Sequence, residues 1–191
     1  FTDGSQGTYD LVVGADGSTS TVASTVRGGS RRPERDRIMA VRAYMIGVRG
    51  PGDRADLYFS AESFPGYYWL FPTSATTANV GLGMVLETAP ATDGHLRPML
   101  LELMERDPAM RERLDSAEIV GRVKGWPLTT YNHRARIAVD GLVLVGDAAG
   151  LINPLNGEGI QYALVSGRWA AEAIRSALRA EPSDSYRARA V

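Results

Sequence analysis

The stretch GLVLVGDAAGLINPLNGEGI, residues 141–160, joins a short apolar run to a loop of small residues and then to the expected start of a helix. The apolar run has the composition of a strand buried on both faces of a parallel sheet. Asp147 follows this strand directly, at the edge where open α/β sheets bind ligands. A carboxylate at that edge can accept hydrogen bonds from ligand hydroxyl groups. The stretch therefore predicts a ligand site at the end of the strand.

Small residues and a proline surround this aspartate. Residues with little or no side chain let a ligand lie against the backbone. The first N–H groups of the following helix lack intrahelical partners, so they favour negative charge nearby. For the Gly-Asp-Ala-Ala segment alone, a tight turn capped by the aspartate is an equal alternative. The candidate cofactor-binding residues of this stretch are Gly146, Asp147, Ala148, Ala149, Pro154, Gly157 and Gly159.

A second apolar run, at residues 9–14, precedes Asp16 and Gly17. The glycine lets the chain turn tightly, and Ser18 or Thr19 can cap a helix expected to end at residue 27. Asp16 and Gly17 are therefore two further candidate cofactor-binding residues. The alternative is a plain strand, turn and helix with a capped start.

The middle of the chain changes from strand to helix periodicity. Pro-Gly pairs at 51–52 and 65–66 separate the expected strands. The fold class is therefore α/β with α+β elements: a nucleotide-binding layer at 1–30 and 129–191, interrupted by a mainly antiparallel, substrate-facing sheet domain at 31–128. The last segment, 183–191, is expected to begin a further helix. The expected strands are 38–48, 55–60, 67–71, 78–86 and 120–128. The expected helices are 93–106, 108–114 and 159–179. The last helix is expected to pack through a side that includes Ile160, Leu164 and Leu178.

The segment PGYYWLFPTSATTANVGLG, residues 65–83, carries aromatic residues at alternate positions. In a strand, Tyr67, Trp69 and Phe71 project from one face. Three aromatic rings on one face form a broad apolar wall that suits an apolar ligand. We therefore take these residues and Pro72 as candidate substrate-binding residues. The alternative is that the aromatic stripe is ordinary core.

Bulk composition excludes several classes of site. The 191 residues include 21 basic and 22 acidic ones, a balance that gives no general attraction to nucleic acid. The absence of cysteine rules out a disulfide, a thiolate metal site or a cysteine nucleophile within the chain. His95 and His133 lack companions for metal binding, so no metal site is expected. The chain opens FTDG without an initiator methionine, and we expect a piece of a longer protein.

Together the three motifs resemble the FAD-dependent oxidoreductases of the flavoprotein monooxygenase superfamily, and the Tyr-x-Trp-x-Phe-Pro segment is most similar to their geranylgeranyl reductase branch. The resemblance implies that Asp147 binds the ribityl chain of FAD and that Pro154, Gly157 and Gly159 line its isoalloxazine ring. It places the segment at Asp16 near the pyrophosphate and ribityl region. The family's G-x-G-x-x-G turn, which holds the ADP half of FAD, does not occur in this sequence. The N-terminal part of the family fold is therefore expected to be missing.

The resemblance implies an enzyme that reduces C=C bonds of a prenyl chain, taking hydride from reduced flavin. The expected substrate is a hydrophobic small molecule or prenyl lipid, with an unknown electron donor and with no catalytic residue assigned. The expected location is the cytoplasm, with contact to a membrane surface left open through the arginine-rich loop at 31–37. Two alternatives remain: a monooxygenase (hydroxylase or epoxidase) of the same superfamily, and an electron-transfer flavoprotein that passes electrons to a quinone.

Overall fold

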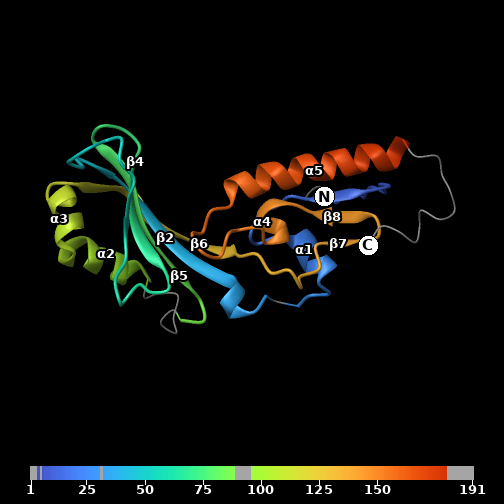
Figure 1. The fold of residues 1–191 in the computed structure, drawn as a ribbon, viewed down its shortest axis with the longest axis horizontal. Helices are drawn as coiled ribbons and strands as arrows, with labels where there is room; N and C mark the ends of the chain where they lie inside the picture. Colours follow the sequence, from blue (N-terminus) through green and yellow to red (C-terminus); the bar gives the residue numbers. More distant parts are fainter. Residues whose placement is uncertain (1–3, 5, 31, 89–95, 180–191) are drawn as a thin grey trace. The chain divides into compact units, whose positions relative to one another are not determined.

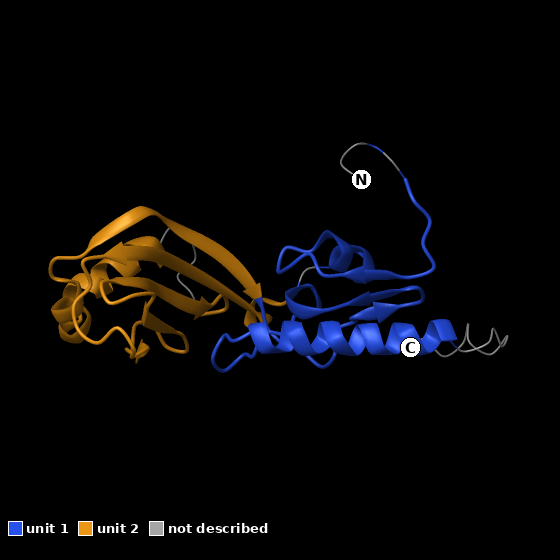
Figure 2. Ribbon diagram, turned by 90° about the horizontal axis from the view of Figure 1, so that it is seen from above, with its two compact units in different colours: residues 1–32, 129–191 blue, residues 33–128 orange. Residues whose placement is uncertain are grey.

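The computed structural model describes residues 4, 6–30, 32–88 and 96–179. The chain divides into two compact units, which Figure 2 distinguishes by colour. The first unit combines residues 1–32 with 129–191, and the second unit is formed by residues 33–128. Figure 1 shows the elements of each. The fold is mixed α/β, with a small mixed sheet in the first unit and a five-stranded antiparallel sheet in the second.

The sheet of the first unit has the order β1 (Val12–Gly14), β8 (Leu142–Leu144) and β7 (Ala138–Val139). β1 and β8 pair in parallel, with Val13 opposite Val143, and β7 pairs with β8 antiparallel. The parallel character predicted for the two distant apolar runs is confirmed. Their predicted burial on both faces is wrong for β1, where Val12 and Val13 are 37% and 41% exposed. Among the described residues β1 lies at the edge of the sheet and has only β8 beside it.

Two short helices flank this sheet. α1 (Thr21–Val26) presents Ala23 and Val26 to a small apolar core that includes Leu144 and Ala149. α4 (Gly146–Ala149) follows β8 directly. The shortness of both helices fits their role as connections that position a loop, because one or two turns contribute little stability without packing.

The third helix of this unit, α5 (Ile160–Arg179), has the predicted length but not the predicted orientation. Ile160, Leu164 and Leu178, expected on the packed side, are 77%, 72% and 73% exposed. Instead Val165 and Trp169 line an apolar pocket of about 640 Å³, which Val143 and Leu144 of β8 also border. The helix has apolar residues on more than one side, and periodicity cannot tell which side packs. The further helix expected at 183–191 lies outside the described residues.

The second unit contains a short 3-10 helix, η1 (Glu34–Asp36), and a sheet of order β3-β4-β5-β2-β6. Neighbouring strands β3 and β4, β4 and β5, and β5 and β2 pair antiparallel. The observed strands match the five expected ones to within a few residues. Their bounds are β2 (Arg37–Ile46), β3 (Asp56–Tyr58), β4 (Tyr67–Pro72), β5 (Thr77–Val85) and β6 (Glu118–Thr129).

Two helices, α2 (Leu96–Arg106) and α3 (Pro108–Leu114), cover one face of this sheet. Tyr68 and Leu70 of β4 pack with Leu100 and Met110 of the helices, and these side chains are at most 2% exposed. Side chains alternate between the faces of a strand, so the neighbours of Tyr68 and Leu70 project from the other face. The expected start of α2 at residue 93 lies outside the described residues.

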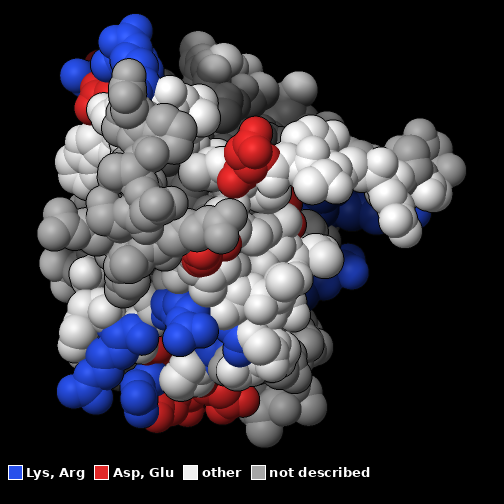
Figure 3. All heavy atoms as spheres, turned by 90° about the vertical axis from the view of Figure 1, so that its right-hand side faces the viewer, with Lys and Arg blue, Asp and Glu red and all other residues white. Residues whose placement is uncertain are grey.

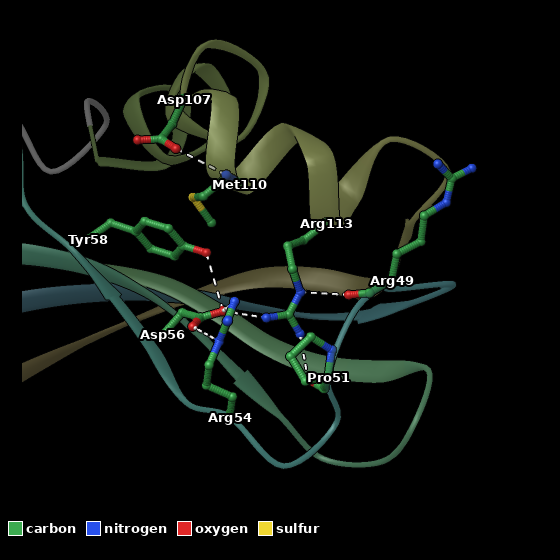
Figure 4. Close-up of polar contacts among 8 residues, drawn as sticks. All are labelled: Arg49, Pro51, Arg54, Asp56, Tyr58, Asp107, Met110 and Arg113. Atoms are coloured by element: carbon green, nitrogen blue, oxygen red, sulfur yellow. Dashed lines mark hydrogen bonds and ion pairs between the residues drawn. The ribbon is translucent and has the colours of Figure 1, made fainter.

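Polar contacts reinforce the packing of α3 on this face, as Figure 4 shows. The buried guanidinium of Arg113 forms an ion pair with Asp56. Its Nε donates to the carbonyl oxygen of Arg49 at 2.6 Å, and its Nη2 donates to that of Pro51 at 2.9 Å. A buried charge is tolerated when it is paired and its other donors are satisfied, as they are at this site.

The opposite end of α3 is attached to the sheet by Asp107. Its Oδ1 accepts hydrogen bonds from the amides of Ala109 and Met110 at 2.9 and 3.0 Å, which caps the helix, and its Oδ2 accepts one from the Tyr68 hydroxyl at 2.5 Å.

Tyr68 stacks on Tyr58 with ring centroids 5.2 Å apart. Burial, helped by the nearby Asp56 charge, raises the pKa of Tyr58 to about 12, and burial with the Asp107 bond raises the pKa of Tyr68. Both hydroxyls therefore remain protonated donors at neutral pH.

Charged side chains of both signs are exposed. Figure 3 shows one face on which basic and acidic side chains lie in small groups among uncharged residues, with groups of opposite sign next to each other along its lower edge. Within the described residues, no helix combines the length and hydropathy that crossing a membrane requires. In the same residues, no three histidine or acidic side chains are grouped so that they could hold a metal ion.

The buried ion pair leads to a prediction for stability. Replacing Arg113 with Ala removes the buried cation beside Asp56 and leaves its carboxylate only the exposed Arg54, whose Nε lies 2.7 Å from Asp56 Oδ1. We therefore expect the free energy of unfolding to fall by about 3 kcal/mol, the lower end of the range for a broken buried pair. Urea denaturation of the whole chain measures this change. Arg111→Ala, on the exposed side of the same helix, is the matched control and should change the free energy by less than about 0.5 kcal/mol. A similar small change for both variants would contradict the role given to Arg113.

Candidate functional site

The carboxylate of Asp147 lies in the first turn of α4, directly after β8. It is half-buried, and its Oδ2 accepts a hydrogen bond from Ser18 Oγ at 3.2 Å. Ser18 belongs to the turn after β1, so the structure brings together the two motifs that lie far apart in the sequence. The parallel pairing of β1 with β8 causes this, because the carboxyl ends of parallel strands lie at the same edge of a sheet.

Asp16 organises the start of α1. Its carboxylate accepts from Ser20 Oγ at 2.5 Å and from the amides of Thr21 and Val22 at 2.8 and 3.3 Å. Burial by itself raises the pKa of Asp16, but the bond from Ser20 and those from the backbone amides outweigh it, so the pKa lies below its ordinary value. The helix cap predicted at residue 18 or 19 is wrong: Ser20 is the cap, and its Oγ accepts from the Ala23 amide at 2.7 Å. The chain can turn before it because Gly17 has φ of +81°.

The loop between α4 and α5 is closed by Asn153, which sequence reasoning did not select. Its Oδ1 accepts from the Leu155 amide at 2.8 Å, and its carbonyl oxygen accepts from the Gly157 amide at 2.9 Å. The Asn153 amide in turn donates to the carbonyl oxygen of Glu158 at 2.8 Å. Pro154 is exposed within this loop. The Asn-Pro dipeptide is a turn signal from which the role of Asn153 could have been found.

Glycine beside Asp147 keeps the space around its carboxylate open. A Cβ at position 159 would lie 3.1 Å from Asp147 Oδ1 and 3.0 Å from Ile152 Cγ1. Gly146 has φ of +54°, and its amide donates to Ser166 Oγ of α5 at 2.9 Å. Gly159, Asp147 and the two short motifs therefore form one cluster, which we call the Asp147 cluster: Asp16, Gly17, Ser18, Gly146, Asp147 and Gly159.

Two other candidates, Ala148 and Ala149, are each only 1% exposed. Their small side chains serve close packing, and only their backbone could approach a ligand. Their carbonyl oxygens accept hydrogen bonds from arginines: Arg27 Nη2 bonds Ala148 at 2.9 Å, and Arg32 Nη2 bonds Ala149 at 3.0 Å. Sequence reasoning assigned Arg32 only to the arginine-rich loop at 31–37. In the structure, both arginines instead stabilise the C-terminal carbonyl groups of α4, which have no intrahelical partners.

The start of α5 already has an acidic partner. Glu158 accepts a hydrogen bond from Gln161 Nε2 at 2.5 Å and from the Gln161 amide at 3.4 Å. The sequence suggested that the first-turn amides have no partners. In the structure, at least one of them, the amide of Gln161, does have one. The glutamate satisfies part of the positive end of the helix dipole.

Aromatic side chains line the second candidate site, on the face of the five-stranded sheet that points away from α2 and α3. Trp69 lies 5.9 Å, centroid to centroid, from both Tyr67 and Phe71, and Phe59 lies 5.9 Å from Tyr67. We call Phe59, Tyr67, Trp69 and Phe71 the aromatic row. Tyr67, Trp69 and Phe71 are half-buried, unlike the fully buried Tyr68 between them. The three side chains are therefore not part of the buried core of this unit, and their role in binding a substrate stays a prediction.

The indole of Trp69 packs closely against β5. Its Nε1 donates to Asn79 Oδ1 at 2.9 Å. A Cβ at position 81 would lie 2.1 Å from Trp69 Cζ2, so only glycine fits beneath the ring. Asn79 and Gly81, in the quoted stretch 65–83, thus orient the tryptophan, which the sequence alone did not reveal. Pro72 ends β4 and is partly exposed, but it lies opposite Ala78, on the face of Tyr68 and Leu70. Strand alternation therefore does not place it on the face of the aromatic row, with which the sequence grouped it.

Comparisons with known proteins identify the class. Residues 36–123 match the model of the geranylgeranyl reductase catalytic domain. Digeranylgeranylglycerophospholipid reductase 2 of Methanopyrus kandleri is 30% identical over 177 residues, which cover 92% of this chain and 44% of that protein. Menaquinone reductase of Mycolicibacterium smegmatis is 29% identical over 195 residues, covering 92% of this chain and 46% of that protein.

Solved structures agree with the sequence matches. A geranylgeranyl bacteriochlorophyll reductase-like protein from Thermoplasma acidophilum superimposes with a TM-score of 0.77 and 29% identity, over 88% of this chain and 41% of that one. A flavin-dependent brominase shares the fold, with a TM-score of 0.72 and 19% identity, over 93% of this chain and 46% of that one.

The chain belongs to the geranylgeranyl reductase family of FAD-dependent oxidoreductases. It spans less than half the length of the relatives that it matches.

The hydrogen bonds of Asp16 predict a pH-dependent effect on stability. Because its pKa is lowered in the folded state, its contribution is present above the ordinary carboxyl value of 3.8 and is lost as the pH falls through the folded-state value. We expect Asp16→Ala to reduce the free energy of unfolding at pH 7 by about 1 kcal/mol. Denaturant unfolding from pH 7 down to pH 3 should show the difference from wild type shrinking at the acidic end.

Asp10→Ala provides the control for this measurement, because Asp10 is exposed before β1. That variant should change the free energy by less than about 0.5 kcal/mol. A difference for Asp16→Ala that stays constant over the whole pH range would contradict the role given to its carboxylate.

Proposed function

We propose that this chain forms the FAD-binding and substrate-binding parts of a flavin-dependent reductase that saturates C=C bonds in a prenyl chain. The observation that carries the proposal is the aromatic row. Its Trp69 packs on Gly81 and is hydrogen-bonded to Asn79, on the sheet face that α2 and α3 do not cover. A plain core stripe would have no need for a fixed, half-exposed indole. Membership of the geranylgeranyl reductase family and the names of the relatives support the choice of a prenyl substrate.

The first unit is the proposed FAD-binding layer, into which residues 33–128 are inserted as the substrate domain. Asp147 would accept hydrogen bonds from the ribityl hydroxyls, and the turn at Asp16 and Gly17 would lie near the pyrophosphate. Gly157, Gly159 and Pro154 would contact the isoalloxazine ring. The residues fit this group, because a side chain at position 159 would fill the space beside the Asp147 carboxylate.

When bound and reduced, FAD supplies a hydride equivalent for reduction of the alkene. The protein's own residues contribute binding and orientation. The aromatic row provides apolar area against which a prenyl chain can lie and from which water is displaced. The high pKa of Tyr58 and Tyr68 reflects their structural hydrogen bonds on the opposite face of the sheet, so we assign neither as the proton donor.

Removal of the Asp147 carboxylate tests the cofactor site. We expect Asp147→Ala to weaken FAD binding about tenfold or more, because a charged acceptor contributes about 1.5–3 kcal/mol per hydrogen bond. The measurement is the ratio of bound flavin absorbance to protein after gel filtration, together with a flavin titration. Asp140→Ala, an exposed aspartate in the turn before β8, is the matched control. If the Asp147 variant retains as much flavin as wild type, the site is assigned wrongly.

Product analysis tests the reaction. The flavin-loaded protein, reduced with dithionite in the absence of oxygen, should add hydrogen across double bonds of a polyprenyl substrate, which mass spectrometry detects. In a parallel incubation of the reduced protein with oxygen, a product that carries an added oxygen atom would identify a monooxygenase instead. Reoxidation of the reduced flavin by a quinone, with every alkene unchanged, would identify an electron-transfer protein.

A further inference from the structure

Glu158 lies between two glycines, Gly157 and Gly159, immediately before α5. Its main chain is held on both sides within the loop that Asn153 closes. The Glu158 carbonyl oxygen accepts a hydrogen bond from the Asn153 amide at 2.8 Å, and the Glu158 amide donates to Asn156 Oδ1 at 3.0 Å. The residue is half-buried. Its carboxylate therefore has a defined position at the start of the helix.

The carboxylate caps α5 from one residue before the usual capping position. Gly159 directly precedes the helix and has no side chain that could accept from the first-turn amides. A side chain there would crowd Asp147, because its Cβ would lie 3.1 Å from Asp147 Oδ1. Glu158 reaches forward instead: its Oε1 accepts from the Gln161 amide at 3.4 Å, and its Oε2 accepts from Gln161 Nε2 at 2.5 Å. Position 158 thus supplies the negative charge at this end of α5.

This charge is not offset by a cation beside it. Among the residues that the structure describes, no lysine, arginine or histidine nitrogen lies within 4.0 Å of the Glu158 carboxylate. The positive end of the α5 dipole favours a negative charge nearby. Because Glu158 already occupies this position, a second negative charge at the same end of α5 is repelled by the carboxylate and has fewer amide donors left to bind.

The proposed function places the isoalloxazine ring of FAD at Gly157 and Gly159, the residues on either side of this carboxylate. Reduction adds negative charge to that ring, and a charged group near it changes the balance between its two redox forms. We propose that Glu158 lowers the reduction potential of FAD bound at the Asp147 cluster. The inference rests on the proposed function and adds to it a residue that makes the reduced cofactor a stronger hydride donor.

Binding of the two redox forms of FAD measures this effect without turnover. The protein is ultrafiltered with oxidised FAD in one arm and with dithionite-reduced FAD under nitrogen in the other. Free flavin in each filtrate is then read by its visible absorbance after reoxidation in air. The ratio of the two dissociation constants gives the shift in potential, and a tenfold change in that ratio corresponds to about 30 mV for a two-electron couple.

Glu158→Gln removes the charge and keeps the size of the side chain and an oxygen that can accept from Gln161. We expect this variant to favour reduced over oxidised FAD about fivefold more than wild type does, because the first turn of α5 is freed from a fixed negative charge. The reduction potential should therefore rise by about 20 mV.

Two further variants separate charge from shape. Glu158→Asp keeps the charge on a side chain one methylene shorter, and its ratio should stay within about twofold of wild type. Glu172→Gln removes the same charge about 20 Å further along α5, where Glu172 pairs with Arg168 at 2.8 Å. Salt screens exposed charges over that distance, so this variant should also stay within about twofold.

Three outcomes would overturn the inference. The ratio for Glu158→Gln could equal that for Glu172→Gln, Glu158→Asp could shift the ratio as far as Glu158→Gln does, or Glu158→Gln could weaken both redox forms equally. The last two would show that the shape of the loop matters and its charge does not. Failure of the proposed function is distinguishable, because wild type would then bind neither form of FAD, or Asp147→Ala would bind both forms as tightly as wild type.

Discussion

The second unit depends on the alternation of side chains along strand β4, which points Tyr68 and Leu70 to one face of the sheet and the other aromatic residues to the opposite face. Tyr68 points into the core, where its hydroxyl bonds Asp107 at the start of α3 and its ring stacks on Tyr58. The ion pair of Arg113 with Asp56 attaches the other end of the same helix. Once the helices occupy this face, strand alternation places the residues on either side of Tyr68 on the opposite face. The aromatic row therefore lies on the face that the helices of this unit do not cover, and the contacts of Tyr68 and Arg113 attach α3 to the other face.

The first unit depends on a similar constraint, the parallel pairing of two strands that are distant in the sequence. This pairing brings the turn after β1 to the turn after β8 and allows Ser18 to bond Asp147. The surrounding groups then stabilise the short helix α4: Ser166 bonds its first amide, and Arg27 and Arg32 bond its last carbonyl groups. Each of these hydrogen bonds restricts the backbone of the loop, which fixes where the Asp147 carboxylate lies.

Much of the fold could be predicted from local pattern. Alternating aromatic and β-branched residues located the strands of the second unit, and Pro108 located the start of α3, because these signals act over a few residues. The failures have one cause, which is that packing is not local. Periodicity located α5 but assigned its packed side wrongly, since the helix has apolar residues on several sides. The cap of α1 was placed at residue 18 or 19, but Ser18 faces Asp147 and Ser20 caps the helix.

The sequence by itself determined which residue types are present at the ends of the strands and that Tyr67, Trp69 and Phe71 share one face, because the two-residue period of a strand is a property of the backbone. Only the tertiary structure decided that this face lies outside the buried core of the second unit and that Gly81 and Asn79 of β5 orient the indole of Trp69. These facts depend on which strands pair and in what register. Register is set by contacts between residues far apart in the chain, which no local pattern records.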